Sequence, residues 1–222
     1  MMKLLHNEAG ADSPLPYLLA LPDGYETPPP GGWPLVFFLH GAGERGADLD
    51  KLSVHGLPRE LAAGRSFPFV AAAPQCPEES DWYWHLSDAA ELLDVLCGRL
   101  CVDRSRIYLT GISMGGFGAW ELALQLPERF AALAPFCGGG MAWRAWRLSH
   151  LPIWAFHGAL DDVVPPYLTE HLVEAVRGSG NAAMLTLLPD AGHDCWTEPF
   201  AGDELYHWLL AQARPHPDSE GA

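Results

Sequence analysis

Short, almost wholly apolar runs alternate along this chain with longer stretches in which apolar residues recur every three or four positions. The apolar runs are typical of strands that are buried on both faces of a parallel sheet. Glycines, prolines and polar residues separate the two kinds of segment, as expected of turns. The runs predict seven strands: Tyr17–Leu21, Leu35–His40, Phe69–Ala73, Arg106–Thr110, Ala131–Pro135, Ile153–His157 and Met184–Leu188.

The periodic stretches predict four helices. In one of them, apolar residues follow helical spacing from Ala89 to Leu100, and Ser87 or Asp88 is expected as its N-cap. Strands and helices that alternate in this way predict an α/β sandwich with a mostly parallel sheet and helices on both faces. The other three helices are expected over Met114–Leu126, Tyr167–Arg177 and Ala201–Gln212.

The length of 222 residues suits one domain of this class. The chain shows no internal repeat, and the segment 26–32 (ETPPPGG) is interpreted as a turn between the first two strands. Sixteen residues precede the first expected strand at Tyr17, and the polar tail 214–222 is expected to be disordered. We therefore expect a single domain over 1–222.

Composition narrows the range of partners. Hydrophobic residues make up 49% and charged residues 18%, which excludes a disordered chain. Thirteen basic and 28 acidic residues give a formal net charge of −15, which repels phosphate backbones and anionic lipid headgroups. We expect no nucleic acid and no membrane as partner. The N-terminus lacks the apolar core of a signal peptide, so we expect a cytoplasmic protein.

The five cysteines have irregular spacing and are interpreted as free thiols in a reducing compartment. Cys97 and Cys101 lie four apart on an expected helix, but no second pair and no flanking histidine accompany them, so small buried residues are the simpler interpretation. The ten histidines show no zinc-ligand spacing either. We therefore expect no metal and no other cofactor.

Residues 106–118 (RIYLTGISMGGFG) form an apolar strand that passes through G-x-S-x-G into a helix. This context is typical of a nucleophile elbow, which exposes a serine hydroxyl at the C-terminal edge of a sheet. The sharp turn requires very small residues two positions before and after the serine, which Gly111 and Gly115 provide. We predict that Ser113 is a nucleophile, the alternative being a glycine-rich turn with an incidental serine.

A serine hydroxyl is a weak nucleophile and requires a base, usually a histidine held by a carboxylate. The segment IWAFHGALDDVVP places Asp161 and Asp162 after a predicted strand, and MLTLLPDAGHDCW places His193 in the loop after the next one. The order Ser113, Asp161 or Asp162, then His193 is the order of such triads on sheets of this kind. The alternative for His193 is an ordinary histidine in a surface loop.

Acyl transfer also needs hydrogen-bond donors for the developing oxyanion. The second strand ends in a glycine-rich loop within LVFFLHGAGERG, residues 35–46. Such a loop supplies one backbone N–H, and the residue after the nucleophile supplies the other. We therefore predict that the oxyanion hole consists of the amides of Ala42 and Met114, the alternative being an ordinary glycine turn.

Several polar residues near these turns are expected to have structural roles. His40 and His157 each precede a glycine at a strand end and are expected to bond to the backbone and shape the turn. Glu44 and Arg45 are expected to pair with each other or with the neighbouring loops.

Together these segments resemble the α/β-hydrolase superfamily. The motifs LHGAGERG, VDRSRIYLTGISMGGFGAWELA, WAFHGALDDVVP and PDAGHDCW are similar to those of the predicted peptidases and phospholipase/carboxylesterase-like proteins. That group is related to esterase D, feruloyl esterases and bacterial polyester depolymerases. The resemblance extends from about Tyr17 to Leu210, and it implies a single catalytic domain without a large lid domain.

The resemblance implies a serine hydrolase that cleaves carboxylic esters through an acyl-enzyme intermediate. It implies Ser113 as the nucleophile, His193 as the base and Asp161 as the acid of an HGxxD pattern that begins at His157. Asp162, near the turn that follows, is then expected to cap backbone amides.

The chain contains nine tryptophans, many of them in expected loops after strands, where open α/β sheets bind ligands. Trp82–Trp84 is expected in a loop that overhangs Ser113, and Trp196 follows closely after His193. We predict a pocket that includes Gln75, Trp84 and Trp196, with Gln75 bonding a substrate oxygen. Such a pocket suits a modest, soluble small-molecule ester, bound by a monomer or a homodimer.

Two other classes of function compete with an esterase. A serine peptidase that acts on short peptides would use the same triad, but the chain has no room for the large gating domain of prolyl oligopeptidase relatives. A non-catalytic binding module usually lacks one member of the triad, whereas Ser113, Asp161 and His193 are all present.

Overall fold

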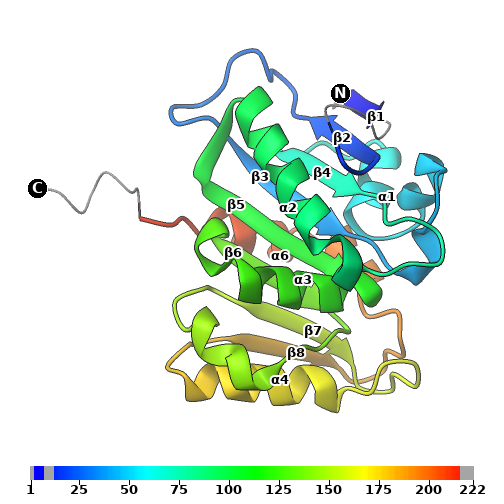
Figure 1. The fold of residues 1–222 in the computed structure, drawn as a ribbon, viewed down its shortest axis with the longest axis vertical. Helices are drawn as coiled ribbons and strands as arrows, with labels where there is room; N and C mark the ends of the chain where they lie inside the picture. Colours follow the sequence, from blue (N-terminus) through cyan, green and yellow to red (C-terminus); the bar gives the residue numbers. More distant parts are fainter. Residues whose placement is uncertain (1–2, 8–12, 216–222) are drawn as a thin grey trace, which may run out of the picture.

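The computed structural model of the protein describes residues 3–7 and 13–215. Its strands form one eight-stranded sheet, seen across the middle of the molecule in Figure 1. The strands are β1 (Lys3–Asn7), β2 (Tyr17–Leu21), β3 (Trp33–Leu39), β4 (Val70–Pro74), β5 (Val102–Ile112), β6 (Ala132–Phe136), β7 (Trp154–Gly158) and β8 (Met184–Leu188).

The sheet has the order β1-β2-β4-β3-β5-β6-β7-β8. β1 pairs antiparallel with β2, and β2 antiparallel with β4, whereas every other pair is parallel. The carboxyl ends of the parallel strands therefore meet at one edge of the sheet, where ligands of open α/β sheets bind. β5, the longest strand, lies between β3 and β6, so the loops after these strands are neighbours.

Helices cover both faces of the sheet (Figure 1): α2, α3 and α4 pack on one face, and α1, α5 and α6 on the other. The helices are α1 (Gly56–Ala62), α2 (Trp82–Arg99), α3 (Met114–Gln125), α4 (Tyr167–Gly178), α5 (Thr197–Ala201) and α6 (Glu204–Leu210). Short 3₁₀ helices span Ala42–Glu44, Leu49–Val54, Pro127–Arg129 and Ala142–Leu148.

Strand β3 shows why the central strands are almost continuously apolar. Leu35, Phe37 and Leu39 belong to the core between the sheet and α2, α3 and α4. Val36 and Phe38 point to the opposite face and belong to the second core, beneath α1, α5 and α6. Successive side chains of a strand alternate between faces, so a strand covered on both faces needs an apolar residue at every position.

The predicted fold class is confirmed, and all seven predicted strands are present, two with the predicted bounds (Tyr17–Leu21 and Met184–Leu188) and five with shifted ends. The expectation that the first strand begins at Tyr17 is wrong, because β1 precedes it and pairs Lys3 with Leu21 along the outside of β2. A five-residue edge strand has little apolar periodicity of its own. Its position is decided by pairing with β2 rather than by its local sequence.

The expected start of the second helix at Ser87 or Asp88 is also wrong. α2 begins at Trp82, because the carboxylate of Asp81 accepts the Tyr83 N–H at 2.9 Å and caps the helix. The segment Trp82–Trp84 is therefore helical and not a loop. Trp82 is fully buried and donates its indole N–H to the carbonyl of His40 at 2.9 Å. The helical spacing of apolar residues thus begins about two turns earlier than was expected.

The helix expected over Ala201–Gln212 corresponds to α6 with shorter ends, and a separate short helix, α5, precedes it and ends at Ala201. The guanidinium of Arg65, far away in sequence, donates hydrogen bonds to the carbonyls of Phe200, Ala201 and Gly202. These carbonyls lie at the end of α5, where a helix leaves acceptors without intrahelical donors. The break is therefore stabilised by a long-range contact that the local pattern does not reveal.

Two further expectations concern the ends of the chain and the membrane. Most of the polar tail, 216–222, lies outside the described residues, but Arg214 at its start donates its N–H to the carbonyl of Ser105 at 2.9 Å. Every helix in the described part of the chain is too short or too polar to span a bilayer.

The turn from β5 into α3 depends on close backbone contact. A Cβ atom at Gly111 would lie 2.3 Å from the carbonyl oxygen of Gly115, and one at Gly115 would lie 2.0 Å from the carbonyl oxygen of Leu39. Both clashes are with backbone atoms, which cannot move aside like a flexible side chain. The sequence expectation of very small residues at these two positions is confirmed.

We predict opposite effects for two glycine substitutions. Gly115→Ala should lower the free energy of unfolding by more than about 3 kcal/mol, because its new methyl group overlaps the backbone of β3. Gly98→Ala, near the end of α2 with open space around it, should raise it by about 0.5–1 kcal/mol. Urea unfolding of both variants measures this. Equal stabilities for the two variants would contradict the proposed contact.

Candidate active site

Ser113 occupies the sharp turn between β5 and α3. Its backbone has φ 52° and ψ −118°, a region that residues with a side chain rarely adopt. The Ser113 N–H donates to the carbonyl of Phe136 on the neighbouring strand β6 at 3.1 Å, and its carbonyl accepts the Phe117 N–H. Strained serines of this kind persist only where the surroundings fix them, as at nucleophile elbows.

The three residues of the expected triad lie in one hydrogen-bonded chain. The Nε2 atom of His193 lies 2.9 Å from the Ser113 Oγ, and its Nδ1 atom lies 2.8 Å from Asp161 Oδ2. Ser113 comes from the β5–α3 turn, Asp161 from the loop after β7 and His193 from the loop after β8. The topology of the sheet thus brings together residues that are up to 80 positions apart in sequence.

Asp161 uses both carboxylate oxygens. Oδ2 faces His193, while Oδ1 accepts the N–H groups of Val163 and Val164, each at 2.9 Å. The expectation that Asp162 caps this turn is therefore wrong, because Asp161 caps it and Asp162 is exposed. Burial acts to raise the pKa of Asp161, but the hydrogen bonds from His193, Val164 and Val163 outweigh burial and lower it.

His193 is held from the side by Trp196. The two rings meet edge to face, with centroids 5.3 Å apart and an interplanar angle of 88°. Trp196 is buried and in turn contacts the ring of His55 at 5.6 Å. Trp196, predicted as a pocket residue, therefore lies beside the base and limits the rotation of its ring.

The two predicted oxyanion donors both begin helices. Met114 is the first residue of α3, and Ala42 is the first residue of the 3₁₀ helix that follows β3. The N–H groups in a first helical turn have no acceptor within their own helix, so both are available to a ligand. Because β3 and β5 are neighbours in the sheet, their two loops lie side by side at its C-terminal edge.

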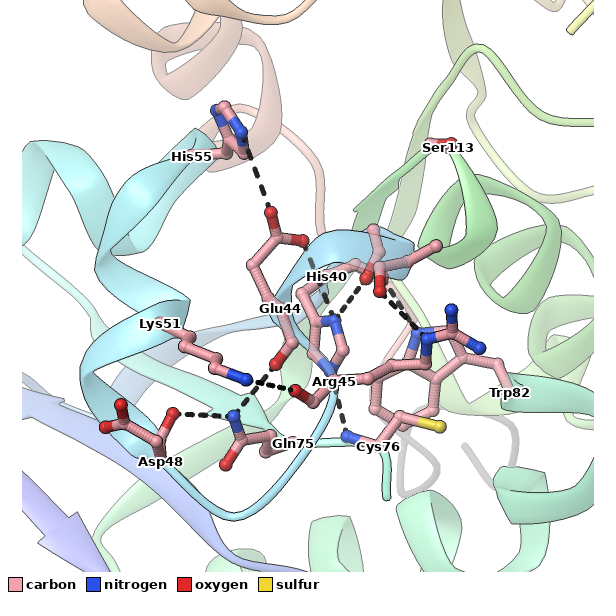
Figure 2. A network of polar contacts seen from close by, with 12 residues as sticks. His40, Glu44, Arg45, Asp48, Lys51, His55, Gln75, Cys76, Trp82 and Ser113 are labelled. Carbon is pink, nitrogen blue, oxygen red and sulfur yellow. Dashed lines mark hydrogen bonds and ion pairs between the residues drawn. The ribbon is translucent and has the colours of Figure 1, made fainter. Parts of the chain in front are cut away.

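A buried polar network supports the Ala42 loop from below (Figure 2). The Glu44 carboxylate lies between His40 and His55, 3.7 Å from the nearest ring nitrogen of each, and is only 5% exposed. Burial alone would raise the pKa of Glu44, but the neighbouring His40 ring, with smaller effects of His55 and the Gly41 amide, lowers it. The negative charge is thus retained inside the loop.

Arg45 does not pair with Glu44. Its Nε donates to the carbonyl of Ala42 at 2.8 Å, and its Nη1 donates to the carbonyl of Ser80 at 2.9 Å. Of the two structural roles expected for Arg45, the contact with neighbouring loops is therefore the one found.

The remaining predicted pocket residues differ in their exposure. Gln75 is fully buried, and its side-chain amide donates to the carbonyls of Glu44 and Asp48 at 2.8 and 2.7 Å (Figure 2). This amide fixes the Ala42 loop and does not face solvent, so we do not place Gln75 in the pocket. Trp84 lies on the first turn of α2 and is 77% exposed, which leaves its ring available to a ligand.

A hollow of about 520 Å³ adjoins the loop that carries His193. Neither Ser113 nor His193 lines it, so it flanks the triad and does not contain it. It is lined by Leu188, Pro189, Asp190, Ala191, Gly192, Asp194, Cys195, Thr197 and Glu198.

Known proteins resemble this arrangement in sequence and in fold. Residues 11–167, which include the Ala42 loop, Ser113 and Asp161, match the family described as "Putative esterase". The chain belongs to this esterase family. It is accordingly a hydrolase that acts on esters, built on the α/β-hydrolase fold.

Individual members and neighbours of the esterase family agree over most of the chain. A "Poly(3-hydroxyoctanoate) depolymerase" of Pseudomonas fluorescens is 27% identical, covering 86% of this chain and 77% of the relative. A "Probable feruloyl esterase C" of Aspergillus niger is 26% identical, covering 81% and 67%. The crystal structure of a thermostable esterase has a TM-score of 0.81 and 30% identity, covering 96% of this chain and 63% of that one.

One feature of the site was missed from the sequence of this esterase-family chain. The Cys137 thiol, a carboxylate oxygen of Asp161 and a ring nitrogen of His193 lie within 4.8 Å of one another. They come from three separate loops, so no spacing motif shows the cluster. Cys137 is fully buried, and burial together with the Cys195 thiol raises its pKa well above the usual value. The thiol is therefore protonated at neutral pH.

We predict different results for the two adjacent aspartates. Asp161→Asn should reduce kcat by up to about 10⁴-fold, because the amide favours the wrong tautomer of His193. It should also lower the melting temperature, because Asp161 caps the turn. Asp162→Asn is the matched control and should change the stability by less than about 0.5 kcal/mol. A large loss of kcat in Asp162→Asn with Asp161→Asn near wild type would reverse the assignment.

We also predict that ester hydrolysis needs no metal. Incubation with a strong chelator, followed by gel filtration, should leave kcat unchanged, because both ring nitrogens of His193 are already bonded to Ser113 and Asp161. A loss of activity that added Zn²⁺ restores would show that the Cys137, Asp161 and His193 cluster holds a required ion.

Proposed function

We propose that the protein is a serine esterase that cleaves carboxylic esters through an acyl-enzyme intermediate. The observation that carries the proposal is the continuous hydrogen-bonded chain from the Ser113 hydroxyl through His193 to Asp161. Nucleophile, base and orienting acid in this order define the chemistry of the Ser–His–Asp triad. Membership of the esterase family and the sequence order of the three residues support the same proposal.

In the first step, the Ser113 Oγ attacks the ester carbonyl carbon while the Nε2 atom of His193 takes the hydroxyl proton. The 2.9 Å contact is short enough for this transfer. The negative Asp161 stabilises the imidazolium that forms and keeps the remaining N–H of His193 directed away from the serine. Collapse of the tetrahedral intermediate expels the alcohol, which leaves with the proton from His193. Water then repeats the sequence on the acyl-enzyme and releases the acid.

The amides of Ala42 and Met114 are proposed to stabilise the oxyanion in both steps. Each is the first N–H of a helix, and the dipole of α3 adds positive potential on the side of Met114. Loss of one such donor typically costs about 10²- to 10³-fold in kcat. Buried Glu44 and Gln75 hold the Ala42 loop in place before substrate arrives, so the donors need not be reorganised during the reaction.

The proposed substrate is a small, soluble ester rather than a long lipid. The exposed ring of Trp84 offers an aromatic surface, and Trp196 borders the base. The names of the relatives, a polyester depolymerase and a feruloyl esterase, indicate ester substrates with hydroxyacyl or aromatic acyl groups. A panel of acetyl, hydroxyalkanoyl and feruloyl esters would rank these groups by kcat/KM.

A peptidase would share the triad, and a non-catalytic binding module would share the fold. Parallel assays with p-nitrophenyl acetate and an aminoacyl p-nitroanilide separate the three classes. An esterase hydrolyses the first substrate and leaves the second almost untouched. Equal kcat/KM values for the two substrates would favour the peptidase, and no turnover of either by the folded protein would favour the binding module.

We predict that Ser113→Ala abolishes ester hydrolysis without unfolding the protein. Removal of the nucleophile typically costs about 10⁴- to 10⁶-fold in kcat. Ser87→Ala, an exposed position on α2, is the matched control and should retain full activity. A phosphonate probe should label the wild-type protein at Ser113 alone. Labelling at another residue, or more than a few per cent of residual activity in Ser113→Ala, would refute the assignment.

A further inference from the structure

Two histidines end parallel strands in the same local sequence, His-Gly, and both are fully buried. His40 follows β3, and His157 lies in β7, directly before Gly158. Both were expected only to shape their turns. Their hydrogen-bond partners differ, and the partners determine which ring nitrogens carry hydrogen.

His40 has one donor and one acceptor as partners. Its Nε2 atom accepts the Cys76 N–H at 2.8 Å and therefore carries no hydrogen (Figure 2). Its Nδ1 atom lies 2.6 Å from the carbonyl oxygen of Gly41, to which it donates. His40 is thus neutral, with its single hydrogen on Nδ1.

His157 has an acceptor at Nδ1. The Nδ1 atom lies 2.7 Å from the Thr169 hydroxyl on α4, and that hydroxyl donates its hydrogen to the carbonyl of Gly138 in a short hydrogen bond. Two oxygens in such close contact need a hydrogen between them, and a carbonyl has none to give. The Thr169 oxygen therefore offers His157 only a lone pair, and Nδ1 must carry a hydrogen.

His157 has acceptors at Nε2 as well. This atom lies 2.9 Å from the carbonyl oxygen of Val164 and 3.2 Å from Asp161 Oδ2, and neither group has a hydrogen to donate when Asp161 is ionised. The Val164 carbonyl alone requires a hydrogen on Nε2. We propose that His157 is a permanently charged imidazolium that holds Asp161 from the side opposite His193, as a positioning residue.

The surroundings favour this charged form. A buried imidazolium is tolerated only when it is paired with an opposite charge and its N–H groups are bonded, and His157 meets both conditions. The titratable groups near Asp161 are His157 on β7, His193 after β8 and Cys137 after β6, and α4 contributes the uncharged Thr169. His157 is therefore the cation that balances Asp161 while His193 is neutral.

The consequence for catalysis rests on the proposed function. The negative carboxylate of Asp161, without a second cation beside it, would hold a proton on His193 strongly, and a protonated His193 cannot accept the Ser113 proton. The positive charge on His157 offsets the negative charge of Asp161, so His193 loses its proton and becomes a neutral base at a lower pH. Asp161 can then orient the His193 ring without keeping that ring protonated.

The charge state is tested by ¹⁵N NMR of the wild-type protein labelled at histidine. At about pH 8, above the usual titration range of histidine, both His157 nitrogens should show the shifts of protonated nitrogens, and His40 should show one protonated and one bare nitrogen. The His157 signals are assigned by their loss in His157→Gln. One bare nitrogen on His157 would overturn the proposal. This result does not depend on activity, so it stands or falls separately from the proposed esterase function.

The positioning role is tested by the pH dependence of kcat/KM in His157→Gln, which removes the charge but keeps a donor near Asp161. The acidic limb of the profile should move to higher pH by about one unit, because His193 now keeps its proton longer. His171→Gln, the same change at an exposed position on α4, is the control and should leave the limb unmoved. A lower plateau with an unmoved limb would show a purely structural role and overturn the proposal.

Discussion

The geometry of the active site depends on a close contact between the start of α3 and the sheet, which leaves no room for side-chain atoms. The start of α3 is pressed against the ends of β3, β5 and β6 so closely that Cβ atoms at Gly115 and Gly116 would lie 2.0 and 2.1 Å from the carbonyl oxygens of Leu39 and Phe136. This contact fixes the strained turn at Ser113, and with it the direction of the hydroxyl. It also sets α3 directly behind the nucleophile, where its first N–H and its dipole face the same point.

Asp161 is the electrostatic centre of the same edge. One oxygen closes the turn after β7 and the other lies between His193 and His157, so a single carboxylate joins backbone conformation to the orientation of the base. Most of its stabilisation comes from N–H groups that are already in place, which keeps the carboxylate ionised despite burial. The chain has a net charge of −15, yet at this position it surrounds the negative charge with donors.

A second buried carboxylate, Glu44, supports the neighbouring loop in a related way. It lies between two histidines beneath the segment that carries the Ala42 amide, and Gln75 and Arg45 tie that segment to more distant loops (Figure 2). His55 also contacts Trp196, which in turn borders His193. His55 therefore contacts both Glu44, which supports the proposed oxyanion donor, and Trp196, which borders the base. A substitution at His55 is expected to disturb both parts of the site.

The sequence by itself determined the features that local chemistry dictates. The apolar runs of the central strands, the two glycines around Ser113 and the order Ser113, Asp161, His193 follow from strand burial, from steric overlap and from the requirements of the turn, and these are readable one segment at a time. Tertiary structure alone decided the features that depend on partners distant in sequence. It turned Gln75 inward, paired β1 with the outside of β2, brought Arg65 to the carbonyls at the end of α5, and gave two identical His-Gly pairs different partners. The physical reason is that a side chain's hydrogen bonds, and hence its charge and role, are set by whichever groups the packed sheet brings within 3 Å of it.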